Sequence, residues 1–243
     1  MIGLVAVSHS RALAEAAVHL ALQMGGETPP TVRVAAGGPD DDLGTDAVAI
    51  AAAIDEADSG DGVLVLMDLG SAILSAETAL EFVAAPERVR LSPAPFVEGL
   101  VAAVVTAAGG GDLETVAREC ATAAAAKARQ LGADAEGAAS GVGDTGVAPP
   151  GEALSFEAVV TNPSGLHARP AAAFVKAASR HDADVRIADL ETGADEVSGR
   201  SLLALMALGI RQGSRVRVRA SGPEAEAALT ELRALVDDGF GER

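Results

Sequence analysis

The feature that most constrains the fold is an alternation, through the first 130 residues, of short apolar runs with longer helical patterns. An apolar run with few polar interruptions is typical of a strand buried on both faces, and a helix after each strand predicts parallel pairing. We therefore expect an α/β domain built on a parallel sheet. The predicted strand and helix pairs are 2–7 with 12–24, 31–35 with 46–57, 62–67 with 72–83 and 89–91 with 97–108, followed by a last helix at 113–130.

Residues 132–152 break this pattern, because they are rich in Gly, Ala and Pro and contain two isolated Val as their large apolar side chains. We interpret them as a flexible linker between an α/β domain at 1–131 and a second domain at 153–243. In the second domain the element order becomes βαββαβα, which predicts an α+β open-faced sandwich with an antiparallel sheet. Its predicted strands are 154–161, 183–188, 196–198 and 215–220, and its predicted helices are 168–179, 201–208 and 224–236.

Arginines alternate with apolar residues in the last predicted strand. Arg215, Arg217 and Arg219 should face water, while Val216 and Val218 face the core. We favour a solvated face for these arginines, with a binding patch as the alternative.

Charge and composition narrow the possible partners. The formal net charge is −17, and residues 1–150 hold seven Lys and Arg against 21 Asp and Glu. Trp and Tyr are both absent, so nucleic-acid binding by a basic surface or by base stacking is disfavoured. No uninterrupted apolar stretch of about 18 residues and no basic leader segment occur, so we expect neither a membrane span nor secretion. One cysteine, Cys120, permits no internal disulfide; we expect it to be a buried structural thiol in a cytoplasmic protein.

The most specific motif is N-P-S-G-L-H-A-R-P-A at residues 162–171. Proline in the first helical turn sacrifices no hydrogen bond, so Arg169 and Pro170 predict a helix start. His167 then lies beside free N–H groups that stabilise an anion, and Arg169 offers donors matched to phosphate. Near neutral pH most imidazole is unprotonated, so a ring nitrogen can act as a nucleophile. The motif therefore predicts a histidine that can carry a phosphoryl group.

A second candidate histidine, His9, follows the first predicted strand in V-A-V-S-H-S. Asp68 follows the third predicted strand, so a parallel sheet would bring both side chains to the edge where such sheets bind ligands. A carboxylate beside an imidazole can hold one ring N–H and leave the opposite nitrogen free to attack.

Two predicted helix starts near this edge could bind a phosphoryl group. Gly70 and Ser71 open the helix that follows Asp68, and they would offer backbone donors together with the Ser71 hydroxyl. The segment G-T-D, residues 44–46, offers a similar helix start with Thr45 as a further donor.

The segment G-L-H-A-R-P-A, residues 165–171, matches in full the motif of the HPr phosphocarriers of the sugar phosphotransferase system, and the chain resembles that family over about residues 153–238. The resemblance implies that His167 accepts phosphate from enzyme I and that Arg169 supports it. Residues 198–209 are similar to the second helix of the family. Ser201 aligns there with a serine whose phosphorylation regulates some members; a helix cap is the alternative, and we weigh it slightly above regulation.

Residues 1–131 resemble the phosphotransfer subunit of dihydroxyacetone kinase, a relative of the mannose-type IIA domains. The shared segments, in order, are S-H-S, A-A-G, G-T-D-A, M-D-L-G-S-A-I-L-S-A-E-T-A-L-E and A-P-F-V-E-G. The resemblance implies a flavodoxin-like core, a homodimer, His9 as the phosphorylated residue and Asp68 as its orienting partner. It also implies two partners, an ADP-binding kinase subunit and a dihydroxyacetone-binding subunit. We expect no cofactor on this chain, and ADP or ATP with Mg on the kinase subunit.

We therefore expect a cytoplasmic phosphotransferase subunit that relays phosphate from phosphoenolpyruvate through enzyme I, His167 and His9 to ADP. Whether transfer from His167 to His9 occurs within one chain stays open. The alternatives are a IIA component of a mannose-type sugar permease, a regulator that senses phosphorylation state, and a hydrolase with Ser8 or Ser10 as nucleophile. No histidine pair has metal-ligand spacing, so we predict no metal site, and His19 and His181 should have surface or packing roles.

Overall fold

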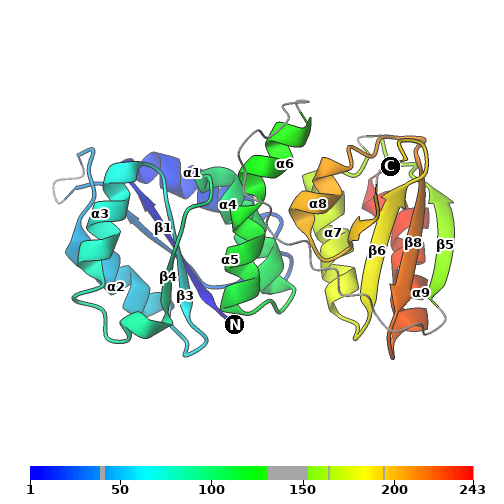
Figure 1. Cartoon of the computed structure of the whole chain (residues 1–243). Helices are drawn as coiled ribbons and strands as arrows, with labels where there is room; N and C mark the ends of the chain where they lie inside the picture. Colours follow the sequence, from blue (N-terminus) through cyan, green and yellow to red (C-terminus); the bar gives the residue numbers. More distant parts are fainter. Residues whose placement is uncertain (39–41, 131–152, 164, 194, 243) are drawn as a thin grey trace. The chain divides into compact units, whose positions relative to one another are not determined.

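The computed structural model describes residues 1–38, 42–130, 153–163, 165–193 and 195–242 (Figure 1). The chain divides into two compact units, Met1–Ala124 and Ala125–Arg243, and we describe each by itself. The predicted linker at 132–152 lies outside the described residues.

The first unit contains a parallel sheet with the strand order β2-β1-β3-β4, which is the order of flavodoxin-like folds. The predicted alternation of strand and helix is confirmed. The elements are β1 (Gly3–Ser8), α1 (Arg11–Leu22), β2 (Val32–Ala36), α2 (Ala47–Ala57), β3 (Val63–Met67), α3 (Gly70–Ala79), η1 (Pro86–Arg88), β4 (Val89–Ser92), α4 (Phe96–Ala108) and α5 (Leu113–Ala121). Helix α6 (Ala123–Gln130) crosses the boundary between the two units.

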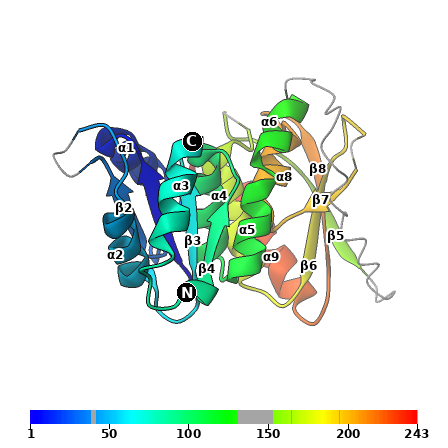
Figure 2. The same ribbon diagram turned by 60° about the vertical axis from the view of Figure 1, so that its left-hand side comes forward.

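Helices cover both faces of this sheet. Figures 1 and 2 show α2 and α3 on one face and α1, α4 and α5 on the other. Every residue of β1 and β3 is consequently buried, which is why these strands read as continuous apolar runs in the sequence. The residues that end these central strands are held in place by this packing.

The predicted single helix at 113–130 is instead two helices that meet at Thr122. At the break, the hydroxyl and the amide of Thr122 both donate to the carbonyl of Glu119, at 2.8 and 3.1 Å. Alanine-rich sequence alone gave no sign of this break. The longest helices have 13 residues, and within the described ranges none is both long and apolar enough to cross a lipid bilayer.

The second unit is an antiparallel sheet of order β5-β8-β6-β7 with its three helices packed on one face, so the predicted α+β class is confirmed (Figure 1). The predicted short strand at 196–198 is reduced to two residues. The elements are β5 (Leu154–Val159), α7 (Ala168–Ser179), β6 (Asp184–Asp189), β7 (Val197–Ser198), α8 (Leu202–Ala207), β8 (Arg215–Ser221), α9 (Ala225–Asp237) and η2 (Gly239–Gly241).

The alternation of β8 is confirmed, because Val216 and Val218 are buried while the arginines point to the open face. Arg217 pairs with Glu157 at 2.9 Å, and Arg219 pairs with Glu196 at 3.2 Å. The guanidinium groups of Arg217 and Arg219 are thus already paired with nearby carboxylates, in agreement with a solvated face.

Candidate functional sites

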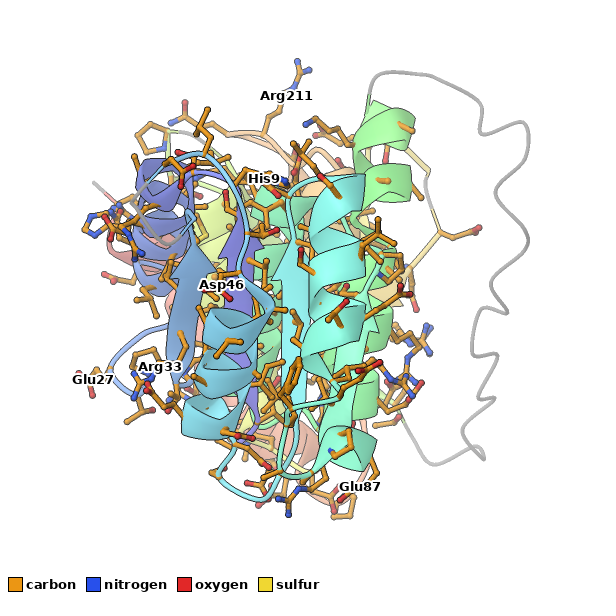
Figure 3. The ribbon with its side chains drawn as sticks, turned by 90° about the vertical axis from the view of Figure 1, so that its left-hand side faces the viewer. His9, Glu27, Arg33, Asp46, Glu87 and Arg211 are labelled. Atoms are coloured by element: carbon orange, nitrogen blue, oxygen red, sulfur yellow. The ribbon has the colours of Figure 1, made fainter. Side chains whose placement is uncertain are left out.

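The first candidate site lies at the carboxyl edge of the parallel sheet. His9 comes directly after β1, and the following helix begins at Arg11 with Ser10 as its cap. Figure 3 shows His9 at one end of the sheet, whereas Glu87 lies beyond the opposite end. The strands that follow β1 in the chain, β2 and β3, lie on opposite sides of it, so the strand order reverses at β1. Ligands bind at such switch points in open α/β sheets.

Asp68 contacts His9 at this edge, as the sequence predicted. Its Oδ1 lies 3.0 Å from Nδ1 of the His9 ring, and its Oδ2 accepts from the His9 amide at 2.9 Å. The Asp68 side chain is 8% exposed and that of His9 is 24% exposed. The carboxylate is thus shielded while the His9 ring remains partly accessible.

Several donors converge on the Asp68 carboxylate. Besides His9, the Ser8 hydroxyl donates to Oδ2 at 2.9 Å and the Leu69 amide donates to Oδ1 at 2.7 Å. Burial opposes ionisation and would raise the pKa of Asp68, but the hydrogen bonds from His9, Ser8 and Leu69 outweigh it and lower that pKa below its ordinary value. Asp68 is therefore a carboxylate at neutral pH.

This carboxylate fixes the tautomer of His9. An ionised carboxylate only accepts hydrogen bonds, so Nδ1 must carry the proton and Nε2 holds the lone pair. The Ser71 hydroxyl lies 2.9 Å from Nε2 and, with that tautomer, donates to it. Ser71 is exposed, so the nitrogen that can act as nucleophile is covered by one side chain at the surface.

The start of α3 adds backbone donors to this site. The Ala72 amide binds the Leu69 carbonyl at 3.0 Å, and Leu69 at the N-cap supplies no side-chain hydrogen bond to the earlier amides of Gly70 and Ser71. A methyl group added to Gly70 would meet no atom within 4 Å. The predicted helix start at Gly70 and Ser71 therefore offers both donors and space for an anion.

The start of α2, where Thr45 was predicted to be a phosphate donor, differs from the start of α3. Asp46 caps it by accepting from the amides of Val48 and Ala49, so these donors already have a carboxylate partner. The Thr45 hydroxyl lies 2.7 Å from that of Ser75, which joins this loop to α3. Ser75 was not predicted from the sequence, although its position one helical turn after Ser71 was the available signal.

Ser8 and Ser10 are poorly suited to act as hydrolytic nucleophiles. Ser8 is completely buried and its hydroxyl is bound to Asp68. Ser10 accepts a hydrogen bond from the Leu13 amide at 3.3 Å and caps α1. The structure thus weighs against the hydrolase alternative.

The second candidate site surrounds His167, which is the N-cap residue of α7 with Pro170 in the first turn, as predicted. Gly165, two residues before it, has a φ of +66°, and a Cβ there would lie 2.3 Å from the carbonyl oxygen of Ile210. The buried Asn162 donates to the Gly165 carbonyl at 2.6 Å. Glycine is therefore required for the tight turn that presents His167.

Glu242 is the contact of His167 that the sequence did not reveal. Its Oε2 lies 3.1 Å from Nε2 of His167, and Asn162 donates to the same oxygen at 3.3 Å. The His167 side chain is 42% exposed, and no hydrogen bond from the residues that the structure describes reaches its Nδ1. Glu242 lies 75 residues from His167 in the chain, so no local pattern could indicate this pair.

The charges around His167 favour an ionised Glu242. Partial burial would raise the pKa of Glu242, but the hydrogen bonds from His167 and Asn162 and the nearby positive charge of Arg169 lower it. The imidazole makes no capping hydrogen bond to α7, so the amides of the first turn stay available. Arg169 in this turn is exposed, and its role at a phosphoryl group stays a prediction.

The remaining candidate residues are Ser201, His19, His181 and Cys120. Ser201 caps α8 by accepting from the Ala204 amide at 3.1 Å. His19 is exposed, and His181 pairs with Glu231 at 2.7 Å. Cys120 is buried, as predicted, and burial raises the pKa of its thiol to about 12.

Comparisons with known proteins match each unit to a family. The family described as PTS system fructose IIA component matches residues 3–117, and the PTS HPr component phosphorylation site family matches residues 154–238. A solved structure of HPr-C-His from Thermoanaerobacter tengcongensis is 33% identical and covers 37% of this chain and 98% of its own, at a TM-score of 0.35.

Curated relatives match the chain over its whole length. The phosphoryl donor subunit DhaM of the PEP-dependent dihydroxyacetone kinase of Escherichia coli K12 is 43% identical over 250 residues, covering 100% of this chain and 51% of the relative. DhaM of Pantoea ananatis is 41% identical over 246 residues with the same coverage. This chain therefore spans about half the length of these relatives.

Proposed function

This chain belongs to the family of phosphotransfer proteins that join a mannose-type IIA domain to an HPr domain, and from that premise we propose that it carries phosphoryl groups on His167 and His9. In the proposed route, phosphate passes from phosphoenolpyruvate to enzyme I, then to His167, then to His9, and finally to ADP on a dihydroxyacetone kinase subunit. The similarity to DhaM along the full chain supports this route.

The observation that carries the proposal is that the two histidines are held by carboxylates at opposite ring nitrogens. Asp68 holds Nδ1 of His9, and Glu242 holds Nε2 of His167. Each carboxylate keeps a proton on the nitrogen that it contacts, so Nε2 of His9 and Nδ1 of His167 are the proposed nucleophiles. Both rings are partly exposed and stand at a helix start.

Phosphoryl transfer between imidazoles needs little covalent chemistry from the protein. The P–N bond on the donor breaks as the bond to the attacking nitrogen forms, through a loose, in-line transition state. When Nε2 of His9 attacks the phosphorus on Nδ1 of His167, Nδ1 of His167 leaves with the bonding pair. Nδ1 of His9 keeps its proton, which stays hydrogen bonded to the Asp68 carboxylate. Ser71 then donates to a phosphoryl oxygen instead of to Nε2, and the first amides of α3 stabilise the equatorial charge.

The partners follow from the same proposal. We infer that enzyme I supplies His167, that the nucleotide and Mg are substrates held by the kinase subunit, and that a third subunit binds dihydroxyacetone. This chain then needs no cofactor of its own. We propose that the chain acts as a cytoplasmic homodimer, as its resemblance to the mannose-type IIA domains implies.

Two other functions remain as alternatives. A IIA component of a mannose-type sugar permease would use the same His9 chemistry but pass phosphate to a membrane-bound partner. A regulator would form a stable phosphoprotein and bind a target in one phosphorylation state. The similarity to DhaM over the whole chain favours the kinase subunit over both.

The test is labelling with ³²P-phosphoenolpyruvate and enzyme I, followed by addition of the ADP-loaded kinase subunit and dihydroxyacetone. We expect label on His167 and His9 and its discharge to dihydroxyacetone phosphate. His9→Ala should keep label on His167 and lose discharge, whereas His167→Ala should lose both unless a separate phosphorylated HPr is added. Label on other residues, or normal discharge by His9→Ala, would contradict the route.

A further inference from the structure

Ser8 is a buried polar residue whose contacts point to a specific task. It is the last residue of β1, and its side chain is 0% exposed although it directly precedes the accessible His9. Its hydroxyl donates to Oδ2 of Asp68 at 2.9 Å and accepts from the Ser10 amide at 3.1 Å. Burying a hydroxyl is costly unless it is hydrogen bonded, and the Ser8 hydroxyl here both donates and accepts a hydrogen bond.

These contacts complete the hydrogen bonding of the Asp68 carboxylate. Oδ2 accepts from Ser8 and from the His9 amide, while Oδ1 accepts from the Leu69 amide and contacts the His9 ring. Two contacts on each oxygen define the plane of the carboxylate. The Ser8 bond joins β1 to the residue that follows β3, so it ties the two neighbouring strand ends that carry the site.

The Ser10 amide determines the direction of the Ser8 hydroxyl. Because the oxygen accepts from that amide, its proton is left to point at Asp68. Ser10 is also the cap of α1, so the start of this helix and the carboxylate are linked through one oxygen atom. In the described structure, the Ser8 hydroxyl makes no hydrogen bond to the His9 imidazole.

We propose that Ser8 is a positioning residue for His9, which acts through Asp68 to keep the proton on Nδ1 and the lone pair on Nε2. This inference rests on the proposed function of His9 but makes a separate claim about the resting ring. Without the Ser8 hydroxyl, Asp68 loses one of its donors and can turn away from the ring. A larger share of His9 would then carry its proton on Nε2, and a protonated Nε2 has no lone pair with which to attack phosphorus.

Ser92 provides a matched control. It is also the last residue of a strand of this sheet, is 4% exposed, and accepts from the amide two residues on, Ala94, at 3.2 Å. Its hydroxyl makes no hydrogen bond to Asp68 in the described structure. Ser92→Ala therefore removes a buried hydroxyl of the same kind at the same edge without touching the carboxylate.

The experiment is ¹⁵N NMR of the histidine rings in the full, unphosphorylated chain. Ser8→Ala should raise the ratio of the Nε2–H form to the Nδ1–H form of His9 about fivefold. Losing the whole hydrogen bond between the ring and the charged carboxylate would change this ratio more. Ser92→Ala should leave the tautomer ratio unchanged. Should Ser8→Ala prove unstable, Ser8→Cys, a nearly isosteric but weaker donor, should give an intermediate ratio.

A transfer assay separates the two claims. With a separate phosphorylated HPr as donor, Ser8→Ala should lower the rate of His9 phosphorylation about fivefold, and Ser92→Ala should not. An unchanged tautomer ratio in both Ser8 variants overturns the positioning role even if His9 is labelled normally. A shifted ratio with label found elsewhere in the chain upholds the positioning role and refutes the proposed function.

Discussion

Oδ1 of Asp68 lies 3.0 Å from Nδ1 of His9, although 59 residues separate the two in the chain. Replacing Asp68 with Asn should keep the shape of the side chain but remove the charge that holds the Nδ1 proton. A hydrogen bond to a charged group is worth about 1.5–3 kcal/mol, so we expect His9 phosphorylation to slow by about 10- to 100-fold. Rapid-quench measurement of transfer from phosphorylated HPr gives this rate.

The control for charge is Glu87→Gln. Glu87 is exposed and lies beyond the opposite end of the sheet (Figure 3), so this substitution changes net charge equally without approaching His9. Equal rates for Asp68→Asn and the parent chain would show that the carboxylate does not prepare the ring.

The lowered pKa of Asp68 predicts a pH dependence of stability. A carboxyl whose pKa is lower in the folded state stabilises the fold fully above its unfolded pKa of about 3.9. That contribution is lost as the pH falls through the folded pKa. Urea denaturation should show that the parent chain is more stable than Asp68→Asn by about 1–2 kcal/mol. This difference in free energy of unfolding should stay constant from pH 5 to 7 and should shrink below about pH 4. A difference that grows on acidification would contradict the assignment.

Ser71→Ala should slow His9 phosphorylation by about tenfold, because the phosphoryl group loses the hydroxyl that now covers Nε2. Since Ser71 is exposed, the free energy of unfolding should change by less than about 0.5 kcal/mol. Thr78→Ala is the matched control, because its hydroxyl lies on the same helix but is bound to the Leu74 carbonyl. Rate loss in the Thr78 variant would point to a general effect of altering α3.

Glu242→Gln should affect only the second site. Removing the charge that holds Nε2 of His167 should slow phosphorylation of His167 by enzyme I about tenfold. Phosphorylation of His9 from a separate phosphorylated HPr should be unchanged. Initial rates with each donor measure the two effects, and an equal loss at both histidines would contradict independent preparation of the rings.

Gly165→Ala should destabilise the unit that contains His167 by more than about 2 kcal/mol, since a left-handed φ costs a residue with a Cβ about 1–2 kcal/mol and that Cβ would also meet Ile210. Gly213→Ala is the control. It has a φ of +89° but nothing within 4 Å of an added Cβ, so it should cost about 1 kcal/mol through strain alone. Denaturant unfolding of the two variants separates the clash from the strain.

Local sequence patterns predicted the elements that present both histidines. The continuous apolar runs of β1 and β3 predicted parallel strands, so His9 and Asp68 could be assigned to one edge of a sheet before the structure was known. Proline at position 170 predicted the start of α7. The break at Thr122 was missed because the alanine-rich sequence on either side of it favours a continuous helix.

The sequence by itself determined the two fold classes, the strand ends and helix starts, and the identity of the two histidines, because periodicity, proline and short motifs act over a few residues. Only the tertiary structure decided which nitrogen of each ring is held. The partners that decide it, Asp68 with its Ser8 support and Glu242, reach their histidines across long chain separations. The tautomer of an imidazole depends on the atom that faces each nitrogen, and chain folding alone brings that atom into place.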